Sequence, residues 1–197
     1  MSAAGIVLAG VAGTRIGGDK ALQPFGAATL LDAVIARVEG QVSTLALSVP
    51  ANSASTYARF GAPLVFDSFP EGTGPLAGIV AGLGWLAARG EARWLASFPC
   101  DTPFLPRDLV AQLLTQADQV PVAARDANGL HGVCALWPVA CAPTLRAGVE
   151  AGTLRSLKSA LAALGATACD IAGDAGAFFN VNTQDDLSKA EALARRQ

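Results

Sequence analysis

Charged residues are scarce in this 197-residue chain, where they make up 15% of the sequence against 52% for hydrophobic residues. This balance excludes a disordered chain and indicates a large buried core. The formal net charge is only -2, so the chain lacks the basic field that attracts DNA or RNA, and we expect no nucleic-acid partner. Any phosphate-bearing ligand would need donors gathered at a local site.

Histidine and cysteine are also rare. His131 is the only histidine, and none of the four cysteines is part of a C-x-x-C pair. A structural zinc site is therefore disfavoured, and a chain of this length has no need of a disulfide framework. We expect buried free thiols at Cys100, Cys134, Cys141 and Cys169.

Targeting signals are missing as well. The N-terminal segment MSAAGIVLAG has no basic region of the kind that opens a signal peptide. One long charge-free stretch, residues 72–88, contains five glycines and a proline, which favours a core element over a membrane span. We expect a cytoplasmic protein with no membrane partner.

Short apolar runs alternate with segments of helical periodicity over the first 125 residues or so. Predicted strands are 5–10, 45–49, 63–66, 94–98 and 120–124, and predicted helices are 30–38, 76–89 and 105–117, the last opened by Pro106. Strands that are apolar on both faces and alternate with helices are typical of a parallel sheet covered by helices.

The alternation of apolar runs with helical segments becomes less regular after Asp126. The sequence there predicts an antiparallel strand at 133–137, an amphipathic helix at 154–164 and a final helix opened by a Thr183–Asp186 capping box. No repeat or linker interrupts the chain. We therefore expect an α/β fold, a single-domain three-layer sandwich with a mostly parallel central sheet and helices on both faces.

A glycine-rich segment, Leu8–Lys20, directly follows the first predicted strand. Ligands of open parallel sheets bind beyond the carboxyl ends of strands. Glycines let the backbone approach phosphates, and Arg15 and Lys20 can neutralise a polyphosphate. The spacing from Gly10 to Gly13 does not fit G-x-G-x-x-G, and residues 13–20 only approximate a Walker loop, because Asp19 separates the last glycine from Lys20. We interpret the segment as a phosphate-binding loop, with a plain flexible turn as the alternative.

Two aspartates follow predicted strands. Asp101 lies in the proline-framed segment 98–106 and is suited to hold Mg²⁺, which prefers one or two carboxylates plus substrate phosphates. Capping of the next helix is the alternative. Asp67 follows the strand 63–66 and could accept hydrogen bonds from a base or sugar, or begin a turn.

Two further segments could approach a ligand. Gly72–Gly78 runs into a helix N-terminus, which is a natural anion site. Asn180 and Asn182 occupy alternate positions of an extended segment and point the same way. They could reach a ligand or a metal, or simply end the strand.

In order along the chain, these segments resemble the molybdenum cofactor guanylyltransferase (MobA) family of the nucleotidyltransferase superfamily. The family pattern is a LAGG-x-x-x-RMGG-DK loop, then D, GPLAGI, PCDTPFLP and NVNTPEDL. The chain has LAGVAGTRIGGDKAL, VFDS, GPLAGIVAGL, FPCDTPFLP and FFNVNTQDDL. The match spans nearly the whole length. It implies a single Rossmann-like nucleotidyltransferase domain over residues 1–197, with a nucleotide half of about 1–105 and a second-substrate half of about 106–197.

The resemblance also implies a reaction. GTP and molybdopterin, usually already carrying molybdenum, would give the guanine dinucleotide cofactor and pyrophosphate, with Mg²⁺ as the cofactor. The terminal phosphate of the pterin would attack, so no general base is needed, and phosphoryl transfer depends mainly on positioning and charge neutralisation. Molybdenum-insertion proteins, molybdoenzyme clients and their chaperones are the protein partners that the resemblance suggests.

Site roles follow from the resemblance together with the residue types. Arg15, Lys20 and Asp101 are the candidate catalytic residues, and Asp101 and Asn182 the candidate metal ligands. Asn180 and Asn182 would face the second substrate. The candidate nucleotide-binding residues are Leu8, Ala9, Gly10, Gly13, Lys20, Asn52, Asp67, Gly78 and Asp101. His131 aligns with a histidine often seen in the family, and either a structural role or contact with the second substrate is open.

Two alternatives to this reaction stay open, and the first comes from a departure from the family pattern. Val11 stands where the family has its second loop glycine, and a β-branched residue tolerates positive φ poorly. A nucleotide-binding regulator that has lost turnover is therefore one alternative, and we expect Val11→Gly to raise the affinity for GTP. A cytidylyltransferase acting on the same pterin is the other, because the sequence distinguishes poorly between guanine and cytosine as the base of the bound nucleotide.

Overall fold

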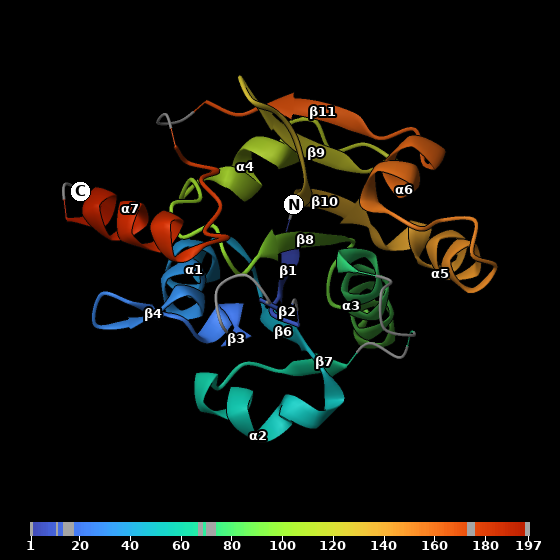
Figure 1. Cartoon of the computed structure of the whole chain (residues 1–197). Helices are drawn as coiled ribbons and strands as arrows, with labels where there is room; N and C mark the ends of the chain where they lie inside the picture. The colour runs from blue at the N-terminus through green and yellow to red at the C-terminus, as the bar shows by residue number, and fades with distance from the viewer. Residues whose placement is uncertain are drawn as a thin grey trace.

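A seven-stranded sheet forms the centre of the molecule, with the strand order β11-β9-β10-β8-β1-β6-β7 (Figure 1). The structure is a computed structural model that describes residues 2–10, 12–13, 18–66, 69, 74–172 and 176–195. The strands of this sheet are β1 (Ala3–Leu8), β6 (Leu45–Val49), β7 (Leu64–Phe66), β8 (Trp94–Pro99), β9 (Val122–Asp126), β10 (Gly129–Pro138) and β11 (Thr167–Asp170).

All but one of these strands run in the same direction. β1 pairs in parallel with β6 and β8, β6 with β7, and β9 with β11. β10 is antiparallel to both of its neighbours. The predicted mostly parallel sheet is confirmed, as is the antiparallel strand expected at 133–137, which is longer than expected. The carboxyl ends of the parallel strands, and the start of β10, consequently meet at one edge of the sheet.

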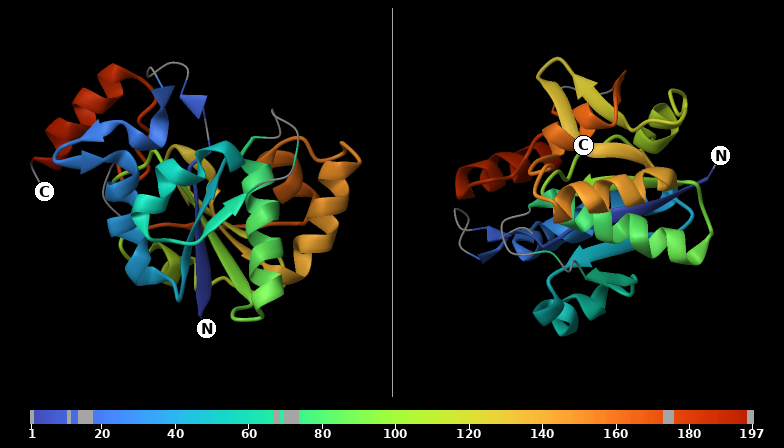
Figure 2. Two further views of the ribbon diagram at one scale, coloured as in Figure 1. Left: turned by 90° about the horizontal axis from the view of Figure 1, so that it is seen from below. Right: turned by 90° about the vertical axis from the view of Figure 1, so that its right-hand side faces the viewer.

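Helices cover both faces of the sheet, as predicted. In the left view of Figure 2, blue α1 lies on one side of the strands and green α3 on the other. The helices are α1 (Leu30–Val38), α2 (Ala54–Tyr57), α3 (Pro75–Arg89), α4 (Leu109–Leu114), α5 (Ala142–Glu150), α6 (Leu157–Ala163) and α7 (Gln184–Ala194).

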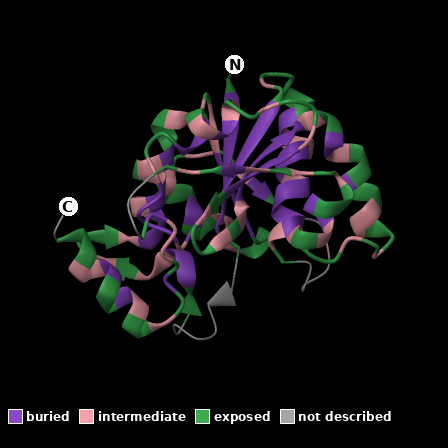
Figure 3. Cartoon of the chain, turned by 90° about the horizontal axis from the view of Figure 1, so that it is seen from above, coloured by how far each residue is buried: buried purple, intermediate pink, exposed green. Residues whose placement is uncertain are grey.

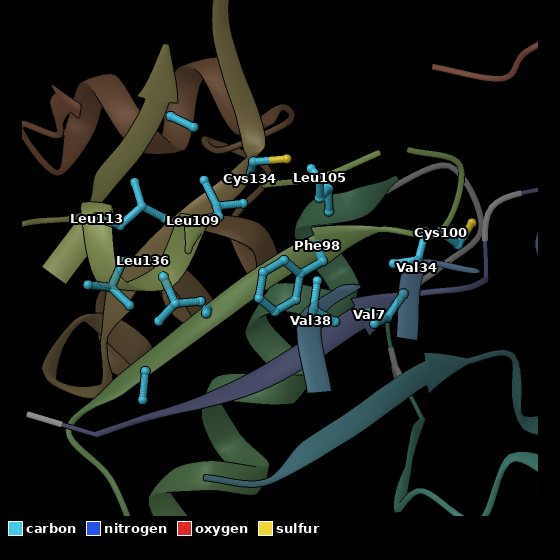
Figure 4. Packing of buried hydrophobic residues seen from close by; sticks show 14 of the residues in the cluster. Val7, Val34, Val38, Phe98, Cys100, Leu105, Leu109, Leu113, Cys134 and Leu136 are labelled. Carbon is cyan, nitrogen blue, oxygen red and sulfur yellow. The ribbon is translucent and has the colours of Figure 1, made fainter. Parts of the chain in front are cut away.

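Two apolar cores hold these layers together, because alternate residues of each strand face opposite sides. On one side, Val7 and Phe98 of the sheet pack against Val34 and Val38 of α1 and Leu109 of α4 (Figure 4). On the other side, Ile6 and Leu95 pack with residues of α3, α5 and α6. The central strands β1, β6 and β8 are accordingly buried over most of their length (Figure 3).

A third, smaller cluster attaches α7 to α1. Leu30 and Phe104 pack there with Val181, Leu187 and Ala190. The capping box predicted for this helix is present, with the Thr183 side chain bonded to the backbone of Asp186 and the Asp186 carboxylate bonded back. This packing returns the C-terminal segment to the sheet edge where β8 ends, and the Val181 amide donates to the Asp101 carbonyl at 2.9 Å.

Some predicted boundaries were wrong. The helix expected at 105–117 covers only Leu109–Leu114, and Pro106 precedes it. Phe104 and Leu105 are buried in the loop, so the apolar pattern there reflects packing of a loop. The helix expected at 154–164 begins at Leu157, where Ser156 caps it. The short elements α2, α5 and β11 were not predicted, because none of them carries a long periodic pattern.

No helix in the described ranges is both long enough and apolar enough to cross a membrane. All four cysteines are buried and free, as expected.

Candidate active site

The glycine-rich loop ends in a short 3₁₀ turn that fixes Lys20. After Ala9 the chain forms a small antiparallel pair, β2 (Ala12–Gly13) with β3 (Gly18–Asp19). The turn η1 (Lys20–Leu22) follows, and Asp19 caps it by accepting a hydrogen bond from the Ala21 amide at 3.1 Å. Lys20 is 7% exposed. A lysine is seldom buried to this degree unless its ammonium group is paired.

The ammonium group of Lys20 pairs with two groups from distant parts of the chain. It donates to the carboxylate of Asp101, beyond the end of β8, and to the side-chain oxygen of Asn182, 2.6 Å away. The side chains of Lys20 and Asp101 are 8% and 13% exposed. The structure therefore brings the lysine of the loop, the aspartate after β8 and the asparagine before α7 into direct contact.

The segment that carries the two asparagines is held against the end of β8. The hydroxyl of Thr102 is 2.6 Å from the side-chain oxygen of Asn180, and 3.2 Å from a carboxylate oxygen of Asp101. Thr102 is 2% exposed. The Asp186 carboxylate accepts a hydrogen bond from the backbone amide of Asn182 at 3.1 Å. The hydrogen bond with the Thr183 hydroxyl, together with other contacts, lowers the pKa of the Asp186 carboxyl.

The N-terminus of α3 lies at the same edge of the sheet. Gly74 precedes it with φ of 64°, a conformation that favours glycine. No side chain of the described residues caps this end of the helix. Pro75 has no N–H group and the Ala77 amide donates to the Gly74 carbonyl at 3.2 Å, so what this end of the helix offers an anion is mainly its dipole, which favours negative charge there.

Gly78 has a packing reason to be glycine. A Cβ atom at this position would lie 2.6 Å from the Ser48 Oγ and 2.9 Å from the Leu8 Cδ2. The absence of a side chain lets α3 lie directly on β1 and β6. Gly78 is thus placed beside Leu8, another of the candidate nucleotide-binding residues.

The other candidate residues differ in how closely they approach this centre. Leu8 and Ala9 are buried at the end of β1, and Gly10 is exposed just beyond them. Asn52 is exposed and accepts a hydrogen bond from the Ser53 hydroxyl at 3.3 Å. The backbone of Gly13 is part of β2. Arg15, Asp67, Val11, Gly72 and Thr73 lie outside the described residues.

The contacts of His131 are structural. Its ring stacks on Phe178, with the ring centroids 4.1 Å apart and the planes at 9°. Its Nε2 lies 2.8 Å from a carboxylate oxygen of Asp126. This distance suits a charge contact, although the geometry is not that of a regular hydrogen bond. The contact with His131 is the main cause that lowers the pKa of Asp126. His131 therefore anchors the chain leading to Asn180.

The oxygen donors at the centre suit a hard divalent cation. Asp101 and Asn182 already direct oxygen atoms at the positive charge of Lys20. Within the described ranges, no group of three or more histidine, cysteine, aspartate or glutamate side chains could hold a metal. A cation at Asp101 would thus depend on substrate phosphates for other ligands, which is the usual situation for Mg²⁺.

Two residues of this centre were not identified from the sequence. Thr102 stands next to Asp101, and a hydroxyl inside a proline-framed segment could have marked it. The hydroxyl of Tyr57 contacts Asp19 and the carbonyl of Ala9, at the two ends of the glycine-rich loop. Tyr57 is the only tyrosine of the chain, but nothing in the local pattern of residues 54–57 indicates contact with the loop.

A mostly parallel α/β sandwich with a glycine-rich turn after its first strand, and a lysine and an aspartate joined at the sheet edge, defines a nucleotidyltransferase. The model of the MobA-like NTP transferase domain matches residues 5–169. The chain belongs to this family.

Relatives and a solved structure agree with this assignment. A molybdenum cofactor guanylyltransferase of Acidiphilium cryptum is 43% identical over 188 residues, covering 95% of this chain and 93% of the relative. Another, of Rhodopseudomonas palustris, is 42% identical, with 98% and 92% covered. The crystal structure of molybdopterin-guanine dinucleotide biosynthesis protein A from Archaeoglobus fulgidus has the same fold, with a TM-score of 0.81 at 21% identity and 98% and 100% of the two chains covered.

Proposed function

We propose that this nucleotidyltransferase transfers GMP from GTP to molybdopterin and releases pyrophosphate. The observation that carries the proposal is the convergence of Lys20, Asp101 and Asn182 at one edge of the sheet. Two relatives that are more than 40% identical over nearly the whole chain are named molybdenum cofactor guanylyltransferases, which supports both the base and the acceptor.

The nucleotide would bind over the ends of β1 and β6 and the start of α3. The backbone of Leu8, Ala9, Gly10 and Gly13 would line it, and the ammonium of Lys20 would turn to its phosphates. The N-terminal end of α3, beside Gly78, would favour the negative charge of the phosphates through the helix dipole. Arg15, as a second cation, and Asn52 and Asp67, on the base and sugar, complete the proposed set of nucleotide contacts.

Asp101 and Asn182 are the proposed ligands of Mg²⁺, which when bound would neutralise charge on the phosphates. The chain itself supplies positioning. Lys20 stabilises negative charge that develops during transfer, and the ordered backbone at the end of β8 holds Asp101 in place. The attacking phosphate is already anionic near neutral pH, so no residue has to remove a proton from it.

The second substrate would bind beside Asn180 and Asn182. Asn180 is exposed, while Thr102 fixes its side-chain oxygen, so its amide group can serve as an oriented donor. In this proposal residues 1–105 hold mainly the nucleotide and residues 106–197 mainly the pterin. Molybdenum-insertion proteins and molybdoenzymes or their chaperones are the proposed protein partners, and the cytoplasm is the proposed location.

Pyrophosphate release is the decisive measurement. The purified chain is mixed with Mg²⁺, molybdopterin and either GTP or CTP, and pyrophosphate is followed over time. We expect release with GTP, and a loss of about 10³-fold or more for Asp101→Asn, since one carboxylate of a metal site carries much of the charge stabilisation. Asp118→Asn changes the charge equally at an exposed position and should match the parent.

The other outcomes are equally informative. Faster release with CTP would make the chain a cytidylyltransferase. Binding of GTP without any release of pyrophosphate would indicate a regulator that has lost turnover. Full activity of Asp101→Asn would refute the assigned metal site.

A further inference from the structure

The hydroxyl group of Tyr57 touches both ends of the glycine-rich loop. Tyr57 is the last residue of α2 and is fully buried, at 0% exposed. Its hydroxyl lies 3.1 Å from the carbonyl oxygen of Ala9, where the loop leaves β1. It lies 2.6 Å from a carboxylate oxygen of Asp19, where the loop returns. One side chain thus joins two points that are ten residues apart in the sequence.

The hydroxyl is a permanent donor. Burial raises the pKa of Tyr57 far above its ordinary value, and the hydrogen bond and negative charge of Asp19 raise it further. The group therefore keeps its proton at any physiological pH. It has a single proton to donate, and the shorter contact indicates that Asp19 is the main acceptor, with the Ala9 carbonyl sharing the proton. A hydrogen bond to a charged acceptor is stronger than one between neutral groups.

Asp19 links the Tyr57 hydroxyl to the turn that carries Lys20. One carboxylate oxygen of Asp19 accepts from Tyr57, and the other accepts from the Ala21 amide, which caps the turn that carries Lys20. The direction of the Lys20 side chain follows from that turn. Its ammonium group then meets Asp101 and Asn182 at the centre of the site. A continuous set of contacts therefore runs from Tyr57 to the lysine.

We propose that Tyr57 is a positioning residue for nucleotidyl transfer, which closes the base of the glycine-rich loop and thereby sets Lys20 for the nucleotide's phosphates. This inference rests on the proposed function. Tyr57 is not a catalytic residue, because its side chain is fully buried and its hydroxyl contacts Ala9 and Asp19. Tyr57 therefore acts through Asp19. Its effect should accordingly appear in the binding of GTP and not in the binding of the pterin.

The test is Tyr57→Phe, which keeps the buried ring and removes only the hydroxyl. We expect the KM for GTP and the directly measured Kd of GTP to rise about tenfold, the effect of losing one hydrogen bond to a charged group. The KM for molybdopterin should stay within about twofold. A merely structural role would change both KM values together, or neither.

Trp137→Phe is the matched control. The indole of Trp137 is also fully buried and donates to the Ser97 hydroxyl at 2.9 Å, but Trp137 pairs with Leu95 near the start of β8, away from the loop. This variant should lower the melting temperature and leave the KM for GTP unchanged. Should Tyr57→Phe fold poorly, Asp19→Ala interrupts the same set of contacts. Asp19→Ala should then raise the Kd of GTP in the same way. Where both single variants fold, the double variant should be no worse than Asp19→Ala alone.

The results separate the inference from the function on which it rests. If the parent binds GTP and releases pyrophosphate while Tyr57→Phe has the same Kd and KM for GTP, the positioning role is refuted and the function stands. A parallel rise in both KM values, or additive effects in the double variant, refutes it as well. If the parent neither binds GTP nor releases pyrophosphate, the proposed function fails and the inference fails with it.

Discussion

Lys20 donates a hydrogen bond to Asp101 across 81 residues of sequence, and both side chains are almost buried. Each charge compensates the other, because an isolated ammonium or carboxylate group in such surroundings would carry a large desolvation penalty. Asn182 adds a second acceptor to the same ammonium. The positive charge of Lys20 consequently lies where the proposed Mg²⁺ would find its protein ligands.

This contact leads to a prediction about metal binding in the absence of nucleotide. The ammonium of Lys20 competes with a divalent cation for the same oxygens, so the free protein should bind Mn²⁺ weakly. Lys20→Met should bind Mn²⁺ at least about tenfold more tightly without nucleotide, because Asp101 then lacks its charged partner. Titration followed by electron paramagnetic resonance of free Mn²⁺ measures this. The same variant should lose most of its transferase activity.

Lys189→Met is the control for the change in net charge. Lys189 forms an exposed ion pair with Asp185, with 2.6 Å between nitrogen and oxygen. Its loss should leave Mn²⁺ affinity and activity unchanged. Lys20→Met should also destabilise the fold by about 3 kcal/mol, the usual cost of removing one partner from a buried ion pair. Equal Mn²⁺ affinity in the parent and in Lys20→Met would contradict the competition.

The sequence predicts which residues form this site better than it predicts the contacts between them. The parallel sheet follows from apolar strands alternating with helices, and the carboxyl edge of such a sheet must gather the ends of β1 and β8. Proximity of Lys20 and Asp101 could therefore be expected. The return of Asn182 to the same site could be expected only from the family resemblance, because it depends on α7 packing onto α1 through Leu187 and Ala190, which no local pattern indicates.

The missed elements have a common physical cause. The edge strand β11 has four residues, only one of which is buried, so its alternation is too short to distinguish it from a loop. The helix α2 likewise has four residues. The predicted start of the helix after Asp101 was wrong because Phe104 and Leu105 are buried in a loop, and apolar periodicity does not separate a packed loop from a helix.

Two glycines of α3 should respond in opposite ways to alanine. At Gly78 a Cβ would meet the Ser48 Oγ at 2.6 Å, whereas at Gly84 the nearest atom is the end of the Arg146 side chain, 3.5 Å away. We expect Gly78→Ala to destabilise the protein by about 1–3 kcal/mol through overpacking. Gly84→Ala should stabilise it by about 0.5–1 kcal/mol, because glycine is unfavourable within a helix. Urea unfolding of both variants measures the difference.

The activities of these variants add a second comparison. Gly78→Ala should also weaken GTP binding, since α3 must move away from Leu8 and the end of β1. Gly84→Ala should bind GTP like the parent. A Gly78→Ala protein as stable as the parent would show that α3 does not lie on the sheet as closely as described.

The cysteines should be unreactive in the folded protein. Burial raises the pKa of the Cys141 thiol from 9.0 to about 11, and burial also raises the pKa of Cys100 and Cys134. Because only the thiolate reacts, a thiol with a pKa of about 11 is about one-thousandth ionised at pH 8, against about one-tenth at a pKa of 9.0. Labelling with a disulfide reagent at pH 8 should be slow until guanidinium exposes four thiols.

Labelling should rise with pH in the folded state, and Cys169 should react first. Its side chain belongs to the edge strand β11 and lines a surface pocket beside Gln112 and Thr115, although burial still raises its pKa. Cys169→Ser should remove the fastest phase and leave three thiols for the unfolded protein. Rapid stoichiometric labelling of all four thiols at pH 8 would contradict their burial.

The hydroxyl of Thr102 offers a way to separate the two substrates. Thr102→Val keeps the shape of the side chain and removes the hydroxyl that fixes the Asn180 oxygen at 2.6 Å. Asn180 is exposed, so water can replace the lost partner, and we expect a loss of stability of only about 1 kcal/mol. Because Asn180 is proposed to contact the pterin, the KM for molybdopterin should rise about fivefold to tenfold while the Kd of GTP stays unchanged.

Thr115→Val provides the comparison for that change. The hydroxyl of Thr115 donates to the carbonyl of Gln112 at 2.7 Å, at an exposed position after α4, so its loss should affect neither substrate. Steady-state kinetics with each substrate varied in turn distinguishes the outcomes. A higher KM for GTP in Thr102→Val, with the pterin KM unaltered, would show that the hydroxyl acts on the nucleotide side, through Asn180 or through its 3.2 Å contact with Asp101, and would contradict the assignment of Asn180 to the second substrate.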